Sequence, residues 1–186
     1  MACSIEALLA RNCAPALAGI KPANLFACPR EEVRALLDYR PLLAQKDISA
    51  RCLCACKKRF LFLVFRPRML EHRLSQTGAR DCLRAFSYPE NASLDALLDR
   101  LARRVRTEPD FPHEIGLFLG YPPEDVAGFI REKGRNCKYS GHWKVYGDPA
   151  LAKRLFRAYD RCTQFFCGAL ERGVPFSRLL QAAPAV

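Results

Sequence analysis

Hydrophobic residues repeat at the spacing of an α-helix in several parts of the chain. The clearest pattern covers residues 93–106, where leucines at positions 94, 97, 98 and 101 share one face and Ser93 precedes them as an N-cap. The same pattern predicts four more helices, at residues 5–14, 29–40, 67–75 and 149–172. The expected N-caps of the first and last are Ser4 and Asp148, and the residues expected just beyond helix ends are Pro15, Pro41 and Gly173.

Residues 50–66 lack the helical spacing. Apolar and polar residues alternate there, and aromatic residues are frequent. These residues flank a Lys-Lys-Arg tip and predict a β-hairpin. A short strand is expected at about residues 142–146, between two glycines. Helices outnumber strands and do not alternate with them. The sequence therefore predicts an α+β protein, a helix-rich single domain over residues 1–186 with a small antiparallel sheet.

Residues 111–133, FPHEIGLFLGYPPEDVAGFIREK, have the spacing of a helix-turn-helix-like hairpin. A first helix is expected over residues 111–119, Gly120 is expected to end it in the left-handed conformation, and Pro123 is expected to begin the second helix. The surface that would face DNA offers one good base-reading donor, Arg131, beside acids that repel phosphates. The sequence favours a packed helical hairpin over a sequence-specific DNA reader.

The adjacent pair His113 and Glu114 is of a kind that catalytic and metal sites use. A zinc protease needs a second histidine four residues after the first, where this chain has Leu117, so that motif is absent. As a general base with Glu114, His113 needs a third group, because neighbouring side chains on a helix diverge by about 100°. The other interpretation is structural, with Glu114 placed favourably at a helix N-terminus.

Ten cysteines raise the question of metal binding. In the segment CLCAC, Cys52, Cys54 and Cys56 would share one face of a strand about 6.6 Å apart, whereas tetrahedral zinc needs sulfurs roughly 3.8 Å apart. We therefore expect small apolar thiols there and no metal site. Cys137, between two nearby cations, is the first candidate for a reactive thiol, and Cys13 is the second.

Charge is the most informative feature of the composition, because 30 Lys and Arg against 19 Asp and Glu give a formal charge of +11. A basic surface favours anionic partners such as nucleic acid, nucleotides or phosphorylated ligands. No apolar run approaches the ~20 residues of a membrane span, so no membrane partner is expected. The first residues, MACSIEALLAR, lack the basic start of a secretory signal, and we expect a cytoplasmic protein with reduced thiols.

Several segments resemble a family of small, uncharacterised proteins from anaerobic Firmicutes, largely clostridia. They are FPHEIGLFLGYPPEDVAGFI, KGRNCKYSGHWKVYGD, NCAPALAGIKPANLF and LFRAYDRC. The resemblance spans nearly the whole chain and implies a bacterial cytoplasm and an anaerobic organism, without an established activity. It directs attention to Cys13, Lys21, Phe111, Pro112, His113, Glu114, Gly120, Tyr121, Cys137, Trp143, Lys144 and Tyr146.

Two main classes of function follow from these features. The first is a protein that binds a small molecule or cofactor, and one form of it is linked to redox chemistry or iron. Its expected partner is an anionic small molecule or a redox partner, and the sequence does not identify the cofactor. Its expected pocket combines aromatic and polar groups, namely Tyr121, Trp143 and Tyr146 with Lys21, His113, Glu114 and Lys144.

The second class is a basic nucleic-acid-associated protein. Residues 131–161 hold nine Lys or Arg and three acids, which predicts weak binding without sequence preference. A third alternative is a thiol-dependent enzyme that uses Cys13 or Cys137 as nucleophile and His113 as base.

Overall fold

The computed structural model describes residues 4–55 and 59–182, which fall into two compact units. The first unit consists of the residues up to Arg68 together with those from Tyr159 onward, and the second is Met69–Ala158. Small antiparallel sheets and a majority of helical residues make this an α+β protein, as the sequence predicts. The single domain expected over residues 1–186 stays a prediction.

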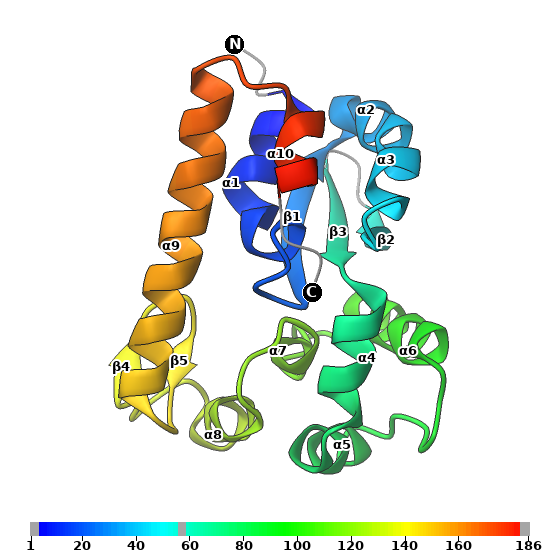
Figure 1. The fold of residues 1–186 in the computed structure, drawn as a ribbon. Helices are drawn as coiled ribbons and strands as arrows, with labels where there is room; N and C mark the ends of the chain where they lie inside the picture. Colours follow the sequence, from blue (N-terminus) through cyan, green and yellow to red (C-terminus); the bar gives the residue numbers. More distant parts are fainter. Residues whose placement is uncertain (1–3, 56–58, 183–186) are drawn as a thin grey trace. The chain divides into compact units, whose positions relative to one another are not determined.

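The first unit contains a three-stranded antiparallel sheet (Figure 1). Its strands are β1 (Ala23–Pro29), β2 (Ser49–Ala55) and β3 (Arg59–Phe65), in the order β1-β3-β2. The predicted hairpin of residues 50–66 is therefore confirmed as β2 and β3, whereas β1 was not predicted. The residues of β1, ANLFACP, do not alternate cleanly between apolar and polar, so no local pattern predicts this strand.

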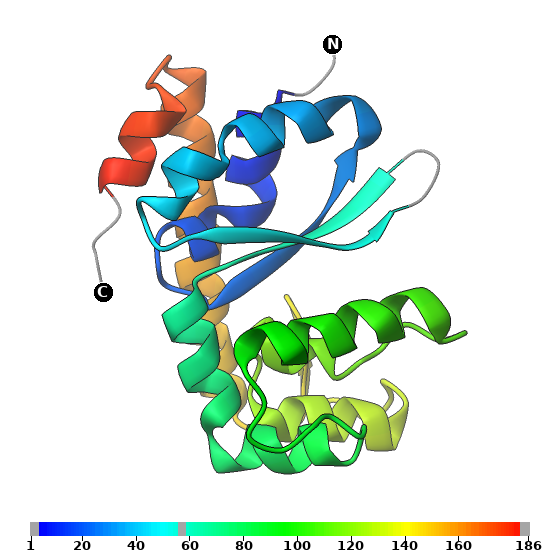
Figure 2. The ribbon, with the colours of Figure 1, turned by 90° about the vertical axis from the view of Figure 1, so that its right-hand side faces the viewer.

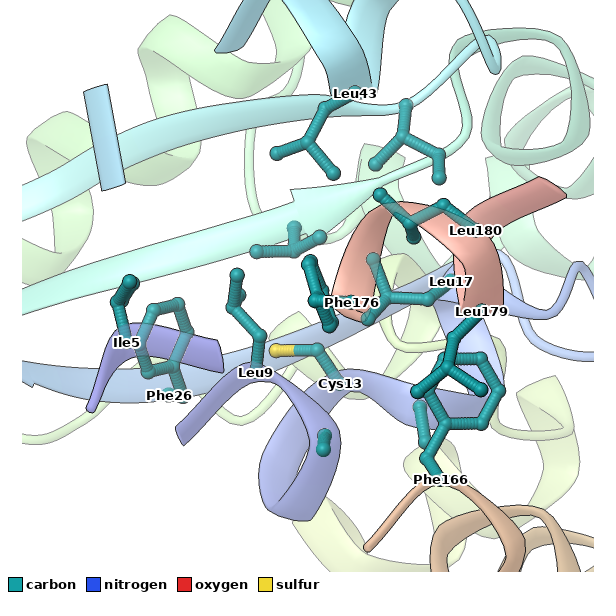
Figure 3. Close-up of a cluster of buried hydrophobic side chains, with 14 of the residues drawn as sticks. Ile5, Leu9, Cys13, Leu17, Phe26, Leu43, Phe166, Phe176, Leu179 and Leu180 are labelled. Carbon is teal, nitrogen blue, oxygen red and sulfur yellow. The ribbon is translucent and has the colours of Figure 1, made fainter. Parts of the chain in front are cut away.

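Helices of the first unit cover one face of this sheet (Figure 2). They are α1 (Ile5–Leu17), the 3-10 turn η1 (Arg30–Glu32), α2 (Val33–Asp38), α3 (Arg40–Ala44), the end of α9 (Pro149–Glu171) and α10 (Phe176–Ala182). Their apolar side chains meet those of the sheet in one core, in which Leu9, Leu17 and Phe166 are buried (Figure 3). Burial of this apolar surface holds the unit together.

Pro15 does not end the first helix, although the sequence predicted that it would. α1 continues through Pro15 to Leu17, and the buried guanidinium of Arg66 donates to the carbonyls of Ala16 (2.8 Å) and Leu17 (2.5 Å) at the end of the helix. The helix predicted over residues 29–40 is present as η1 and α2, which end at Asp38, before Pro41. Pro41 lies in the first turn of α3, which was not predicted, where a missing N–H costs no helical hydrogen bond.

The second unit consists of short helices and a two-stranded hairpin. Its elements are α4 (Pro67–Ser75, which begins two residues before the unit), α5 (Thr77–Arg84), α6 (Leu94–Thr107), α7 (Ile115–Phe118), α8 (Pro123–Glu132), β4 (Tyr139–Ser140), β5 (Lys144–Val145) and the start of α9. The predictions of α4, α6 and α9 are confirmed, including the caps Ser93, which accepts from Ala96 N, and Asp148, which accepts from Ala150 N. α5, α10 and β4 were not predicted.

The expected helical hairpin at 111–133 is present as α7 and α8, but the first helix is shorter than predicted. It begins at Ile115 and not at Phe111, because Phe111 precedes Pro112 and a residue before proline avoids the helical conformation. Gly120 has φ 77° and ends the segment in the left-handed conformation. Pro123 is the first residue of α8, as predicted.

Candidate functional site

A pocket of about 360 Å³ lies in the second unit, between the α7–α8 hairpin and the β4–β5 hairpin. This volume is within the range of small-molecule sites. Its lining residues are Phe111, His113, Ile115, Gly116, Tyr121, Asp125, Val126, Phe129, Ser140, Gly141, His142, Trp143 and Lys144. Aromatic and imidazole rings therefore make up much of the wall.

A buried carboxylate, that of Asp125 on α8, fixes the position of the β4–β5 hairpin. Its Oδ2 accepts from the indole Nε1 of Trp143 at 2.7 Å, and its Oδ1 accepts from the backbone N–H groups of Tyr146 (2.6 Å) and Gly147 (2.7 Å). Asp125 is 2% exposed, and three donors satisfy its charge. The wall of the pocket is thus held by hydrogen bonds between residues that lie 18 to 22 positions apart in the sequence.

The α8 helix can approach this hairpin closely because it has a glycine at the contact. A Cβ atom at Gly128 would lie 2.4 Å from Cγ of Tyr146, a distance that real Cβ atoms do not show. The Tyr146 hydroxyl donates to the carbonyl of Arg135 at 2.8 Å. Tyr146 therefore supports the pocket from outside, whereas the sequence predicted that it would line the pocket.

One wall of the pocket is formed by stacked aromatic rings. The rings of Tyr121 and Trp143 lie 4.5 Å apart with an interplanar angle of 24°. Phe156 of α9 meets Trp143 edge-on, with centroids 4.4 Å apart and an angle of 89°. Trp143 is the single tryptophan of the chain, and these contacts leave it 8% exposed. The rings form a rigid apolar surface that can pack against a flat ligand.

The other side of the pocket carries two side chains with nitrogen donors, His113 and Lys144. The imidazole of His113 lies 4.8 Å from the ring of Phe129, and the chain around Gly134 packs against the same ring. The Lys144 ammonium donates to the Gly134 carbonyl at 2.5 Å, which leaves two of its three N–H groups for another acceptor. At the mouth, Phe111 is 46% exposed.

Glu114 does not share this pocket with its neighbour His113. Its side chain is 1% exposed, and Oε1 accepts from Arg104 Nε at 2.6 Å and from the Tyr88 hydroxyl at 3.1 Å. Burial, and then the charge of Glu114, raises the pKa of Tyr88 far above its ordinary value. The two neighbours therefore have separate environments. His113 lines the pocket, whereas Glu114 forms a buried ion pair with Arg104 of α6.

Two further candidates, Cys13 and Lys21, lie in the first unit. Cys13 is fully buried in the core, and burial raises the pKa of its thiol far above the ordinary value, so the thiol stays protonated and is a poor nucleophile. Lys21 is 5% exposed, burial lowers its pKa to about 8, and its ammonium lies 5.5 Å from the ring centre of Tyr159. These residues line no part of the pocket described above.

Among the residues that the structure describes, the other cysteines do not line the pocket either. Cys137 is half-buried in the second unit and is not among the lining residues. Cys52 and Cys54 lie on either side of a register shift in β2, and Cys56 lies outside the described residues. Within residues 4–55 and 59–182, no group of three or more His, Cys, Asp or Glu side chains is arranged to hold a metal ion. No helix in the same residues is long and apolar enough to span a bilayer.

The pocket expected from the sequence included four of the lining residues, His113, Tyr121, Trp143 and Lys144, and the resemblance also pointed to Phe111. The residue that organises them was missed. The sequence did not single out Asp125, because acids are common in the first turn of a helix. Phe129 has the spacing of an ordinary core residue. The signal that could have identified Asp125 is the lone indole N–H of Trp143, which needs an acceptor when buried.

The fold and the pocket define a small α+β protein with an aromatic-walled cavity. A family model described as "Protein of unknown function (DUF3793)" matches residues 9–180, and the chain belongs to this family. No curated protein and no solved structure matches the chain. The resemblance to an uncharacterised family is therefore confirmed, whereas the origin in anaerobic Firmicutes stays a prediction.

Proposed function

We propose that this protein binds a small organic molecule that has a planar ring and an anionic group. The observation that carries the proposal is the pairing, within one pocket of about 360 Å³, of a stacked Tyr121–Trp143 wall with the ammonium of Lys144. Small-molecule sites commonly combine aromatic walls with a few fixed polar groups. A ring of the ligand packs between Phe111 and the aromatic wall.

Charge in the pocket favours an anion. Asp125 is the acid among the lining residues, and its two oxygens already accept three hydrogen bonds. The charge left for a ligand is that of Lys144, and the imidazole of His113 can add a hydrogen bond. A carboxylate or phosphate bound at these two nitrogens leaves no buried charge without a partner.

Titration with a matched pair of probes tests the proposal. The probes are 2-naphthoate and the neutral 2-naphthylmethanol, which share a flat ring system and differ in charge. We expect 2-naphthoate to change the fluorescence of Trp143 in a saturable way and to bind more tightly than the neutral compound. A charge-assisted hydrogen bond contributes about 1.5 kcal/mol or more, so the expected ratio of affinities is about tenfold.

Two lysine variants provide the control. Lys144→Met should remove the preference for the anion and retain the binding of the neutral probe. Lys138→Met is the matched control, because Lys138 also donates to a backbone carbonyl, that of Gly147, but does not line the pocket. Equal affinities of the wild type and both variants for 2-naphthoate would overturn the proposed anion site, and a fluorescence that does not respond to either probe would overturn the pocket as a ligand site.

A redox-linked ligand is one form of the same proposal. A flavin has a planar ring system and, as a nucleotide, a phosphate, which is the chemistry that this pocket favours. Anaerobic purification followed by an absorption spectrum and metal analysis tests this form directly. A bound flavin would support it, a bound haem or iron–sulfur centre would support an iron link instead, and a protein without a chromophore would contradict both.

A further inference from the structure

A second surface of the same unit carries a cluster of exposed cations. Lys153, Arg154 and Arg157 are exposed on the first turns of α9. Residues three and four apart on a helix are neighbours on its surface, so the three cations form one cluster. None of these three cations lines the pocket, whereas His142, on the neighbouring hairpin, does.

The acids nearest to the cluster in sequence are Asp148 and Asp160, which is exposed three residues after Arg157 on the same helix. Glu132 pairs with Arg131 and accepts from Asn136, and Asp148 caps α9 by accepting from the N–H groups of Ala150 and Leu151. Among the described residues, no ion pair is present for Lys153, Arg154 or Arg157. Like charges this close repel one another, and a bound polyanion relieves that repulsion.

One exposed ring, that of Tyr139, lies beside Lys153 and also stacks on Phe156 (centroids 6.1 Å apart, angle 26°), and a second ring packs against the same helix. The β4–β5 hairpin packs beside the start of α9 (Figure 1), and Tyr139, which is 37% exposed, lies 4.6 Å below the Lys153 ammonium. His142, at the exposed tip of the hairpin, lies 5.1 Å from Phe156 of the same helix. Cations mixed with exposed rings are typical of surfaces that bind single-stranded nucleic acid, where unpaired bases contact the rings.

We infer that Lys153, Arg154 and Arg157, together with Tyr139 and His142, bind the phosphate backbone of single-stranded nucleic acid without sequence preference. A duplex fits less well, because its bases are stacked on one another and cannot contact the two rings. The α7–α8 hairpin offers little for duplex reading: Arg131 is paired with Glu132, and Glu124 is an exposed acid.

Fluorescence anisotropy tests this inference on the full chain. The probes are a labelled oligo(dT) strand of about 15 nucleotides and a duplex of the same length. If each of the three cations neutralises one phosphate, the slope of log K against log salt is about −2 for the single strand. Affinity should therefore fall by about 15-fold between roughly 50 and 200 mM NaCl.

Charge reversal locates the surface. The double variant Arg154→Glu with Arg157→Glu should weaken binding at least tenfold. The slope of log K against log salt should become no steeper than about −0.7, since one cation remains. The matched control, Arg172→Glu with Arg178→Glu, changes the net charge by the same amount on exposed positions of the first unit and should retain the slope. Arg154→Gln with Arg157→Gln, checked by circular dichroism, should reproduce the loss without adding repulsion.

Three results would overturn the inference. They are an anisotropy that does not saturate with the single strand, equal losses in the two reversed variants, and tighter binding of the duplex than of the single strand.

Discussion

Replacing Asp125 by asparagine removes the charge that holds the pocket wall and changes almost nothing in volume. The carboxamide oxygen can keep the position of Oδ1 and its bonds to the N–H groups of Tyr146 and Gly147. Its NH2 group then faces the indole N–H of Trp143, 2.7 Å away, so two donors oppose each other. One charge-assisted hydrogen bond is lost and one buried donor is left without an acceptor.

The magnitude follows from these contacts. A hydrogen bond to a charged group contributes about 1.5–3 kcal/mol, and an unsatisfied buried donor costs a further ~1 kcal/mol or more. We expect Asp125→Asn to lower the free energy of unfolding by about 3 kcal/mol and Asp125→Ala to lower it further, because alanine leaves all three donors unsatisfied.

Urea unfolding followed by circular dichroism measures this effect, and a double-mutant cycle assigns it. In a Trp143→Phe background, where the indole donor is absent, Asp125→Asn should cost no more than about 1.5 kcal/mol. The reasoning is refuted if Asp125→Asn lies within ~0.5 kcal/mol of the wild type, or if its cost is the same in both backgrounds.

Three other predictions follow from the structure. Gly120→Val should lower the free energy of unfolding by more than ~1 kcal/mol, because φ is 77° at this position and a β-branched residue fits it poorly; an unchanged urea midpoint would contradict this. Burial lowers the pKa of Lys21 to about 8, so the folded chain loses this proton at a lower pH than the unfolded chain does. The free energy of unfolding therefore increases as the pH rises through 8. Relative to Lys21→Met, the wild type should therefore gain about 1 kcal/mol between pH 8 and 9, and a constant difference would be inconsistent with the buried ammonium. Alkylation of the denatured protein without reductant should find most of the ten cysteines reduced, whereas three or more native disulfides would argue against the expected cytoplasmic setting.

The sequence was sufficient for elements whose signals are local. α6 combines a leucine face with its cap at Ser93, and the turn at Gly120 and Pro123 needs only the conformational preferences of these two residues. The elements that were missed depend on distant partners. β1 is a strand because β3 pairs with all seven of its residues, and β4 is a strand because β5 returns beside it.

The same distinction explains the candidate site. Tyr121, Trp143 and Lys144 could be selected from residue type and resemblance, and the structure brings them into one pocket with His113. The role of Asp125 depends on contacts 18 to 22 residues away, which no local pattern encodes. Glu114 was grouped with His113 because they are adjacent in sequence, but its charge is paired with Arg104, ten residues earlier.

The most direct test of the proposed function uses the indole N–H of Trp143, which gives a single resonance because the chain has one tryptophan. In a ¹⁵N-correlated NMR spectrum, added 2-naphthoate should shift this resonance in a saturable way, together with the backbone signals of Phe111, His113 and Lys144, which line the same pocket. In Lys144→Met the shifts should need a higher concentration of 2-naphthoate. An indole resonance that stays in place up to millimolar 2-naphthoate, or shifts that spread over the first unit and leave the pocket unchanged, would contradict the proposal.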